Sequence, residues 1–161
     1  MKRILIFLLS ALLILSVSAC SDNSNKVSDA SATEVALTVK EGVTFVDDMF
    51  EVSNEVVPDF YNLPEGVTDF KVYMSASGAT AEELAVFKCD SKKTSDEVIK
   101  ACEKRTENLT EKFEDYIPEE LTKIKSAVIE EKNGFVMFIC ADSTEPAEEK
   151  FEDYKYYRAD N

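Results

Sequence analysis

The chain has 161 residues, of which 32 are acidic and 18 basic, and its formal net charge is −14 at pH 7. Such a surface repels phosphate groups, which argues against nucleic acid and anionic lipid headgroups as partners. The absence of histidine excludes Ser-His-Asp and Cys-His catalysis and removes a common zinc ligand. The length suits one domain with a sizeable core.

The chain begins with the pattern of a secretory signal peptide. Lys2 and Arg3 precede an apolar run at 4–15, broken only by Ser10, and small residues follow. As a helix, residues 4–19 would span about 24 Å, which is less than the ~30 Å hydrocarbon core of a bilayer. We therefore expect a cleaved leader and not a membrane span.

The leader ends in Val17-Ser18-Ala19-Cys20, which resembles the lipobox of bacterial lipoproteins. The resemblance implies that the Cys20 sulfur receives a diacylglycerol and that a type II signal peptidase removes residues 1–19. The alternative is an ordinary signal peptide with an incidental cysteine. Two acyl chains suffice for stable anchoring, so we expect Cys20 to hold the protein at the extracytoplasmic face of the cell membrane.

The expected mature chain divides into a tether and a domain. Removing residues 1–19, with two basic and no acidic residues, would change the net charge from −14 to −16. Residues 20–31 follow the expected cleavage site and are rich in Ser, Asp and Asn. This composition predicts a flexible, solvated tether. Residues 32–161 are then expected to form a single acidic α+β domain.

The first part of this domain predicts short helices. Apolar residues at helical spacing indicate a helix at 32–42, which ends at its glycine. A second short helix is predicted within 54–62, where Pro58 is tolerated only in the first turn. The mixed stretch at 43–52 has no clear periodicity, and we leave it unassigned.

Two strand signals follow. "DFKVYMSA" at 69–76 alternates apolar and polar residues, and "ELAVFKC" at 83–89 is a short apolar run. Thr80 and Glu83 fit a capping box that would begin a helix instead. The apolar run ends too soon for a stable helix, so we predict a strand.

A long helix is predicted next, because Thr94 and Glu97 form a capping box and apolar residues follow at three and four spacing to about Tyr116. Pro118 ends it. Cys102 and Arg105 both fall on its apolar stripe.

The next predicted feature is a hairpin around Asn133-Gly134, the dipeptide of a type I′ turn. Its second strand, 135–141, is apolar throughout, so we expect it to be central and covered on both faces. A final helix is expected from Ser143 or Thr144 toward Tyr157.

After residue 68 the predicted order is strand-strand-helix, repeated once. "FKCDS" at 87–91 and "FICADS" at 138–143 close corresponding strands. We therefore predict an α+β fold with a four-stranded antiparallel sheet, helices mainly on one face, and short helices before it.

"VYMSASGATAEELAVFKC", the capped helix after it and "AVIEEKNGFVMFI" resemble an uncharacterised family of lipid-anchored proteins. The family is known only as a domain of unknown function and occurs mainly in Gram-positive anaerobes. The resemblance covers roughly residues 30–157, and its most specific part is the Ser-Gly-Ala-Thr-Ala-Glu-Glu run. It implies no activity, ligand or catalytic residue, and it agrees with the lipobox.

One loop is a candidate ligand site. Ser75, Ser77, Gly78 and Thr80 bring hydroxyls and a flexible backbone together, which suits an anion or a polar ligand. The alternative is a hairpin connection whose side chains cap their own backbone. The negative surroundings favour this alternative.

The cysteines after Cys20 are odd in number, and none has a CxxC spacing. Cys89 and Cys140 close the corresponding strands and would form a disulfide if those strands were suitably adjacent. The alternative, two small buried hydrophobes, is favoured because an anaerobe gains little from oxidative folding. Cys102 is expected in the core.

The acidic stretch "EPAEEKFEDYKYY" lacks the Asp/Asn-Gly spacing of a calcium loop and predicts a solvated helix face. We predict no catalytic residue, no metal site and no cofactor. The expected function is a non-enzymatic binding or interaction module, anchored through Cys20, with an envelope or membrane protein as candidate partner.

Two alternatives stay open: a cell-envelope hydrolase that uses carboxylates, and an accessory subunit of a membrane transporter or sensor. A cleft with two facing carboxylates of separated pKa would favour the hydrolase. An apolar surface patch would favour protein partners.

Overall fold

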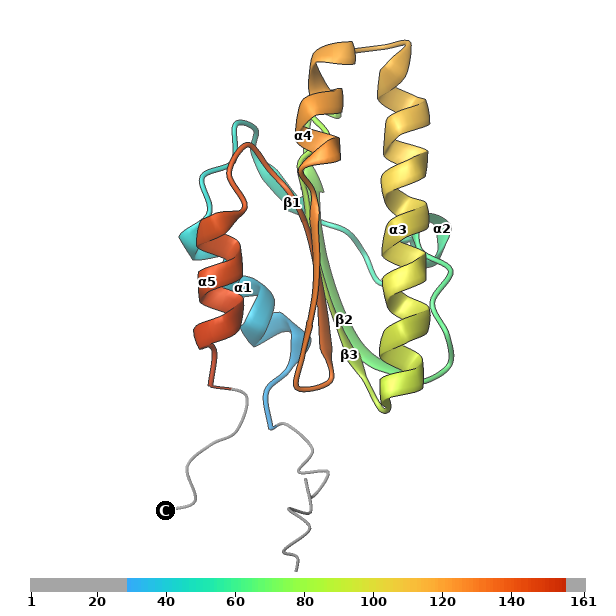
Figure 1. Ribbon diagram of the computed structural model, residues 1–161, viewed down its shortest axis with the longest axis vertical. Helices are drawn as coiled ribbons and strands as arrows, with labels where there is room; N and C mark the ends of the chain where they lie inside the picture. The colour runs from blue at the N-terminus through green and yellow to red at the C-terminus, as the bar shows by residue number, and fades with distance from the viewer. Residues whose placement is uncertain (1–28, 156–161) are drawn as a thin grey trace, which may run out of the picture.

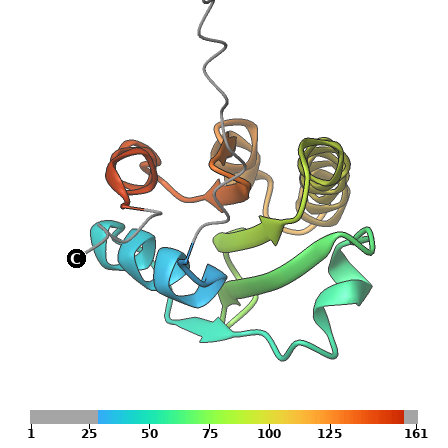
Figure 2. The ribbon, with the colours of Figure 1, turned by 90° about the horizontal axis from the view of Figure 1, so that it is seen from below.

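The computed structural model describes residues 29–155. These residues form an antiparallel sheet of five strands with helices on both faces (Figures 1 and 2). In spatial order the strands are β1 (Met49–Glu51), β2 (Val67–Ser75), β3 (Glu83–Cys89), β5 (Phe135–Cys140) and β4 (Val128–Lys132).

The predicted α+β class is confirmed, but the sheet has five strands and not four. The additional strand is β1, which lies in the unassigned stretch 43–52. Because β1 has only three residues, no alternation can develop in its sequence. Its pairing partner is β2, with Phe50 opposite Met74.

The prediction that the helices lie mainly on one face is wrong. One face is covered by α1 (Ala32–Gly42) and α5 (Glu145–Asp153), and the other by α2 (Val57–Phe60), α3 (Lys92–Glu114), η1 (Pro118–Glu120) and α4 (Leu121–Lys125). The reason lies in the middle of the sheet. β5 is buried at every position, so both of its faces need a covering layer.

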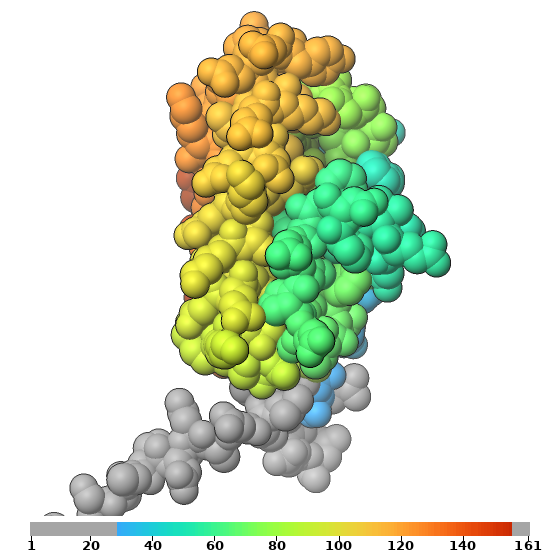
Figure 3. All heavy atoms as spheres, turned by 90° about the vertical axis from the view of Figure 1, so that its right-hand side faces the viewer, coloured from blue at the N-terminus to red at the C-terminus, as the bar shows by residue number. Residues whose placement is uncertain are grey.

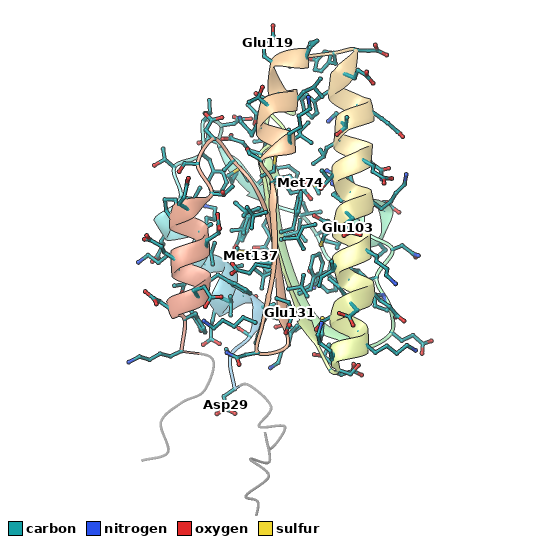
Figure 4. All side chains as sticks on the ribbon, viewed as in Figure 1. Asp29, Met74, Glu103, Glu119, Glu131 and Met137 are labelled. Atoms are coloured by element: carbon teal, nitrogen blue, oxygen red, sulfur yellow. The ribbon has the colours of Figure 1, made fainter. Side chains whose placement is uncertain are left out.

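Two cores result, one on each face. Toward α3 the largest fully buried side chains are Tyr61, Phe87, Phe113 and Phe138. Toward α1 and α5 they are Leu84, Phe135, Met137, Ile139 and Phe151. Figure 4 shows Met74 and Met137 on opposite sides of the sheet.

The helix at 32–42 is confirmed, with a capping box between Ser31 and Glu34. The helix predicted within 54–62 is shorter, and Pro58 lies in its first turn. The long helix α3 begins at Lys92, before the predicted Thr94, because the Ser91 side chain is its N-cap and accepts a hydrogen bond from the Thr94 N–H at 3.2 Å.

The strand prediction at 83–89 and the hairpin are confirmed. Asn133 and Gly134 have φ angles of 52° and 80°, as a type I′ turn requires. β5 is an inner strand, between β3 and β4. The last helix begins after Thr144 but ends at Asp153, and Tyr157 lies outside the described residues.

Candidate functional site

The first residue of β3 is a buried carboxylate with a complete set of partners. Glu83 is 1% exposed and accepts a hydrogen bond from the Tyr61 hydroxyl at 2.5 Å. The Arg105 guanidinium of α3 donates to the same carboxylate, with Nη2–Oε2 at 2.7 Å and Nε–Oε2 at 3.0 Å. Arg105 also lies over the Phe60 ring, 4.9 Å from its centre. The planar guanidinium therefore neutralises the buried charge on Glu83.

Tyr61 remains a hydrogen-bond donor in this arrangement. Burial, followed by the nearby charge of Glu83, raises the pKa of Tyr61 well above its usual value. The phenol therefore keeps its proton at neutral pH and continues to donate to Glu83.

Glu82, the preceding residue, is also 1% exposed. Its carboxylate accepts hydrogen bonds from the backbone N–H groups of Val46 and Asp47, at 2.8 and 2.9 Å. The Thr80 hydroxyl donates to it at 3.1 Å, and Lys123 Nζ lies 3.7 Å away. These contacts hold the segment before β1 against the start of β3.

Lys123 extends these contacts to α4. Its ammonium group lies 3.1 Å from Glu120 and 3.2 Å from Asp142. Glu120 in turn accepts a hydrogen bond from the backbone N–H of Ala81 at 2.7 Å. The buried charges at this end of the sheet are thus paired with one another, and we call Glu82, Glu83, Arg105 and Lys123 the charged cluster.

The predicted ligand loop lies beside this cluster, between β2 and β3. Ser75 Oγ and Ser77 Oγ each donate to the Asp47 carboxylate at 2.5 Å, and the Ser77 N–H donates at 2.9 Å. The Gly78 N–H donates to Ser75 Oγ at 3.2 Å. The remaining member, Thr80, bonds Glu82. The structure therefore brings the four predicted residues together around the chain's own carboxylates.

The Ser75 hydroxyl, followed by the hydroxyl and N–H of Ser77, holds the pKa of the Asp47 carboxyl well below its usual range. Asp47 is thus an anion at all ordinary pH values. It occupies the position in which the sequence suggested an external anion or polar ligand.

A groove of about 230 Å³ opens next to the charged cluster, between α3 and strands β1 and β2. Figure 3 shows this side of the molecule, with α3 in yellow beside the green segment that precedes and includes β2. The charged residues at the groove include Glu83, Arg105 and the exposed Lys112. Its apolar wall consists of Phe50, Phe60, Met74, Leu109 and Phe113.

A second hollow, of about 600 Å³, lies beside the start of α3. It is lined by polar residues such as Asp90 and Thr94, which bond each other at 2.6 Å. Gly66 packs closely against these residues, since a Cβ atom there would lie 2.2 Å from Thr94 Oγ1. Asp90 and Thr94 therefore bond each other and stabilise the start of α3.

The disulfide considered for Cys89 and Cys140 is not formed, and both thiols are free, as is that of Cys102. β3 and β5 are neighbours but antiparallel, so Cys140 lies opposite Glu83 while Cys89 bonds Gly134 at the other end. Six residue steps of ~3.4 Å separate these ends by about 20 Å, whereas a disulfide needs Cα atoms within ~7 Å.

Cys140 is buried, as the alternative of small buried hydrophobes predicts, whereas Cys89 is half-buried. Burial raises the pKa of Cys89 to about 11 and that of Cys140 to about 12. A thiol that keeps its proton is a poor nucleophile and a poor metal ligand.

Two other carboxyls have separated pKa values. Burial, followed by the hydrogen bond and charge of Glu152, raises the pKa of Glu130 on β4 to about 7. Lys132 lowers the pKa of Glu152. This pair has one of the two features expected for a carboxylate hydrolase. It lacks the other, because neither residue lines either hollow described above.

Sequence reasoning did not select the charged cluster as a site. The available signal was Arg105, a charged residue on the apolar stripe of α3. A second signal was the Glu82-Glu83 pair at the start of a buried strand. Both patterns indicate burial of a charged side chain, but neither identifies the residue that pairs with it.

Cys20 and the expected leader at 1–19 lie outside the described residues. Within residues 29–155, no helix is both long and apolar enough to cross a bilayer. The same part of the chain contains no group of three or more Cys, Asp or Glu residues arranged to hold a metal ion.

Fold and site together define a small α+β domain with paired internal charges and an apolar groove at one sheet edge. Residues 43–141, more than half of the chain, match the family described as Domain of unknown function (DUF4358), and the chain belongs to this family. No curated protein and no solved structure matches the chain. The expected uncharacterised family is thereby confirmed, over a shorter range than 30–157. The lipid anchor stays a prediction.

The matched segment begins after α1 and ends before α5. It therefore contains the whole sheet, α3, the charged cluster and the groove. The two helices that cover the opposite face lie outside it.

Proposed function

We propose that this protein is a lipid-anchored, extracytoplasmic, non-enzymatic interaction module at the outer face of the cell membrane. The observation that carries the proposal is an exposed apolar surface around β1. Val46, Phe50 and Val56 are 69%, 47% and 40% exposed, and they are three of the five large hydrophobic residues exposed among residues 29–155. They lie within eleven residues of one another along the chain, and Phe50 also lines the groove. Contiguous exposed apolar area is typical of protein-binding surfaces.

The charged cluster supports binding over catalysis. A general acid or base must be free to exchange a proton with a substrate. Glu83 is instead held by Tyr61 and Arg105, and Glu82 by two backbone N–H groups and a hydroxyl. These groups fix the shape of the groove and the position of β1.

The position of the surface suits a protein tethered through its N-terminus. Asp29 lies at the lower end of the molecule in Figure 4, and Met74, which lines the groove, lies in the upper half. α3, with 23 residues, is about 34 Å long, and the groove lies beside its second half, at Arg105, Leu109 and Phe113. Anchoring at Cys20 would therefore attach the domain at the end that lies farther from the groove.

The test combines the mass of the native protein with crosslinking in cells. We expect diacylglycerol on Cys20, loss of residues 1–19, and release of the protein from membranes by Cys20→Ser. A photocrosslinking residue at Phe50 should give one dominant protein adduct. The same residue at Glu103, exposed on α3, should not.

Two results would overturn the proposal. An unmodified Cys20, or an intact leader, would remove the anchor. Equal adducts from positions 50 and 103, or adducts with peptidoglycan alone, would remove the protein-binding surface.

A further inference from the structure

We infer that β1 binds an extended, positively charged segment of a partner protein, which adds to the sheet as a sixth strand. The inference rests on the proposed function, because it specifies the partner of the same surface. It is carried by three properties of β1: an open backbone edge, a surrounding in which acidic residues predominate, and an apolar groove beside it.

The outer edge of β1 presents free backbone groups. β1 is the last strand on its side of the sheet, and Figure 2 shows no described element beyond it. Asp48 O accepts from Ala76 and Val52 N donates to Val72, so alternate residues, with Phe50 between them, face β2. Backbone groups alternate in direction along a strand, and those of Met49 and Glu51 therefore point outward.

The charge around this edge selects the partner. Residues 43–70 contain seven acidic residues and no lysine or arginine. Asp48, Glu55 and Asp59 are exposed there, and so is Glu51, whose carboxylate pairs with Lys71 Nζ at 2.6 Å. Protected edge strands often carry lysine, whereas this edge is acidic. A second copy of the chain would place two acidic edges together, so a cationic strand is the complementary occupant.

The groove supplies the apolar part of the contact. Phe50 is 47% exposed and lies in the groove wall with Phe60 and Met74. Side chains of neighbouring strands that share a face lie next to each other. A residue of the added strand on the α3 face would therefore lie beside Phe50, at the mouth of the groove. The expected partner segment alternates basic and apolar residues.

The test uses the purified full-length protein and labelled ten-residue peptides of alternating Lys and Val or alternating Glu and Val. We expect saturable binding of the Lys peptide, measured by fluorescence anisotropy, and no binding of the Glu peptide. Hydrogen exchange at residues 49–51 should slow at least fivefold when the Lys peptide is bound, because the outward amides become hydrogen-bonded.

Two variants separate the backbone from the charge. Met49→Pro removes an outward N–H without removing a bond to β2, and it should weaken binding at least tenfold. The double change Asp48→Lys and Glu51→Lys should reverse the preference between the peptides. The matched control, Glu103→Lys with Glu107→Lys, makes the same charge change on the exposed side of α3 and should leave the preference intact.

Each result that contradicts the inference has its own interpretation. Two results would indicate general attraction to an acidic protein and overturn the inference. One is binding of the Lys peptide without slower hydrogen exchange at residues 49–51, and the other is the same reversal of peptide preference in the α3 control. Concentration-dependent dimerisation that Met49→Pro abolishes would assign the edge to a second copy. Crosslinks from Phe50 in cells without peptide binding would overturn strand addition and leave the proposed function standing.

Discussion

The two faces of the sheet are closed in different ways. Toward α1 and α5, the core consists of apolar side chains such as Leu84, Met137 and Phe151, and the two helices pack against each other. Toward α3, the core also contains the Glu83–Arg105 ion pair, and a groove remains open beside β1. The first face is closed by burial of apolar area, and the second also requires the correct pairing of charges.

This difference is consistent with the binding role that we propose for the α3 face. Replacing a buried ion pair by apolar residues is often neutral or stabilising, so stability alone does not explain such a pair. Here the charged cluster positions Asp47, the loop before β3 and the edge strand β1. The family segment 43–141 contains all of these parts, whereas α1 and α5 lie outside it.

The largest expected effect tests the charge pairing on the α3 face. Glu83→Ala leaves Arg105 and the Tyr61 hydroxyl without their partner, and it should lower the free energy of unfolding by about 4 kcal/mol. Urea denaturation measures the change. The double variant Glu83→Leu with Arg105→Met should recover most of the loss. A cost below about 1 kcal/mol would mean that the pair behaves as a solvated surface contact.

The next effect tests the closed face. Phe151 belongs to α5 and is fully buried in the core, so Phe151→Ala should cost about 3 kcal/mol through the cavity that it leaves. The loss should be the same at low and high salt, because the substitution removes no charge. Leu37→Ala on α1, where the side chain is 45% exposed, is the control. Equal costs for the two variants would contradict the packing of α5.

A smaller effect isolates one hydrogen bond of the charged cluster. Tyr61→Phe removes the donor to a buried carboxylate and keeps the ring, so it should cost about 2 kcal/mol. Tyr116→Phe changes a residue that is 66% exposed and should have no measurable effect. If both substitutions are neutral in urea denaturation, the Tyr61 hydroxyl does not stabilise Glu83.

The smallest effect concerns pH and the α5 face. Glu130 keeps its proton in the folded protein up to about pH 7, whereas the unfolded chain loses it near 4.5. The folded state therefore binds more protons between these values, and stability falls as the pH rises through this range. Because the side chain is only half-buried, solvent screening reduces the effect to about 1 kcal/mol.

Glu130→Gln should therefore stabilise the protein at pH 8 and have no such effect at pH 4. Urea denaturation at pH 4, 6 and 8 measures the difference, and Glu149→Gln on the exposed side of α5 is the control. A stabilisation that does not change with pH would show that burial of the charge is not its cause.

Several elements could be predicted from local sequence. The alternation in β2, the apolar run of β5, the Asn133-Gly134 turn and the stripe of α3 each depend on residues close together in the chain. The start of α3 was predicted slightly late because Ser91 and Thr94 both satisfy the chemistry of an N-cap. In the candidate site, the Ser75–Thr80 loop could be predicted from the sequence. Asp47 and Glu82, whose carboxylates accept the hydrogen bonds of this loop, could not.

The amino-acid sequence by itself determined the α+β class, the inner strands, the long helix and the acidic character of the protein, because these follow from periodicity, turn residues and composition. Only the tertiary structure decided that β1 completes the sheet, which helices cover each face, and that Glu83 meets Arg105. Each of these depends on residues distant in the chain, such as Phe50 and Met74, and local patterns do not record which distant residue supplies the partner.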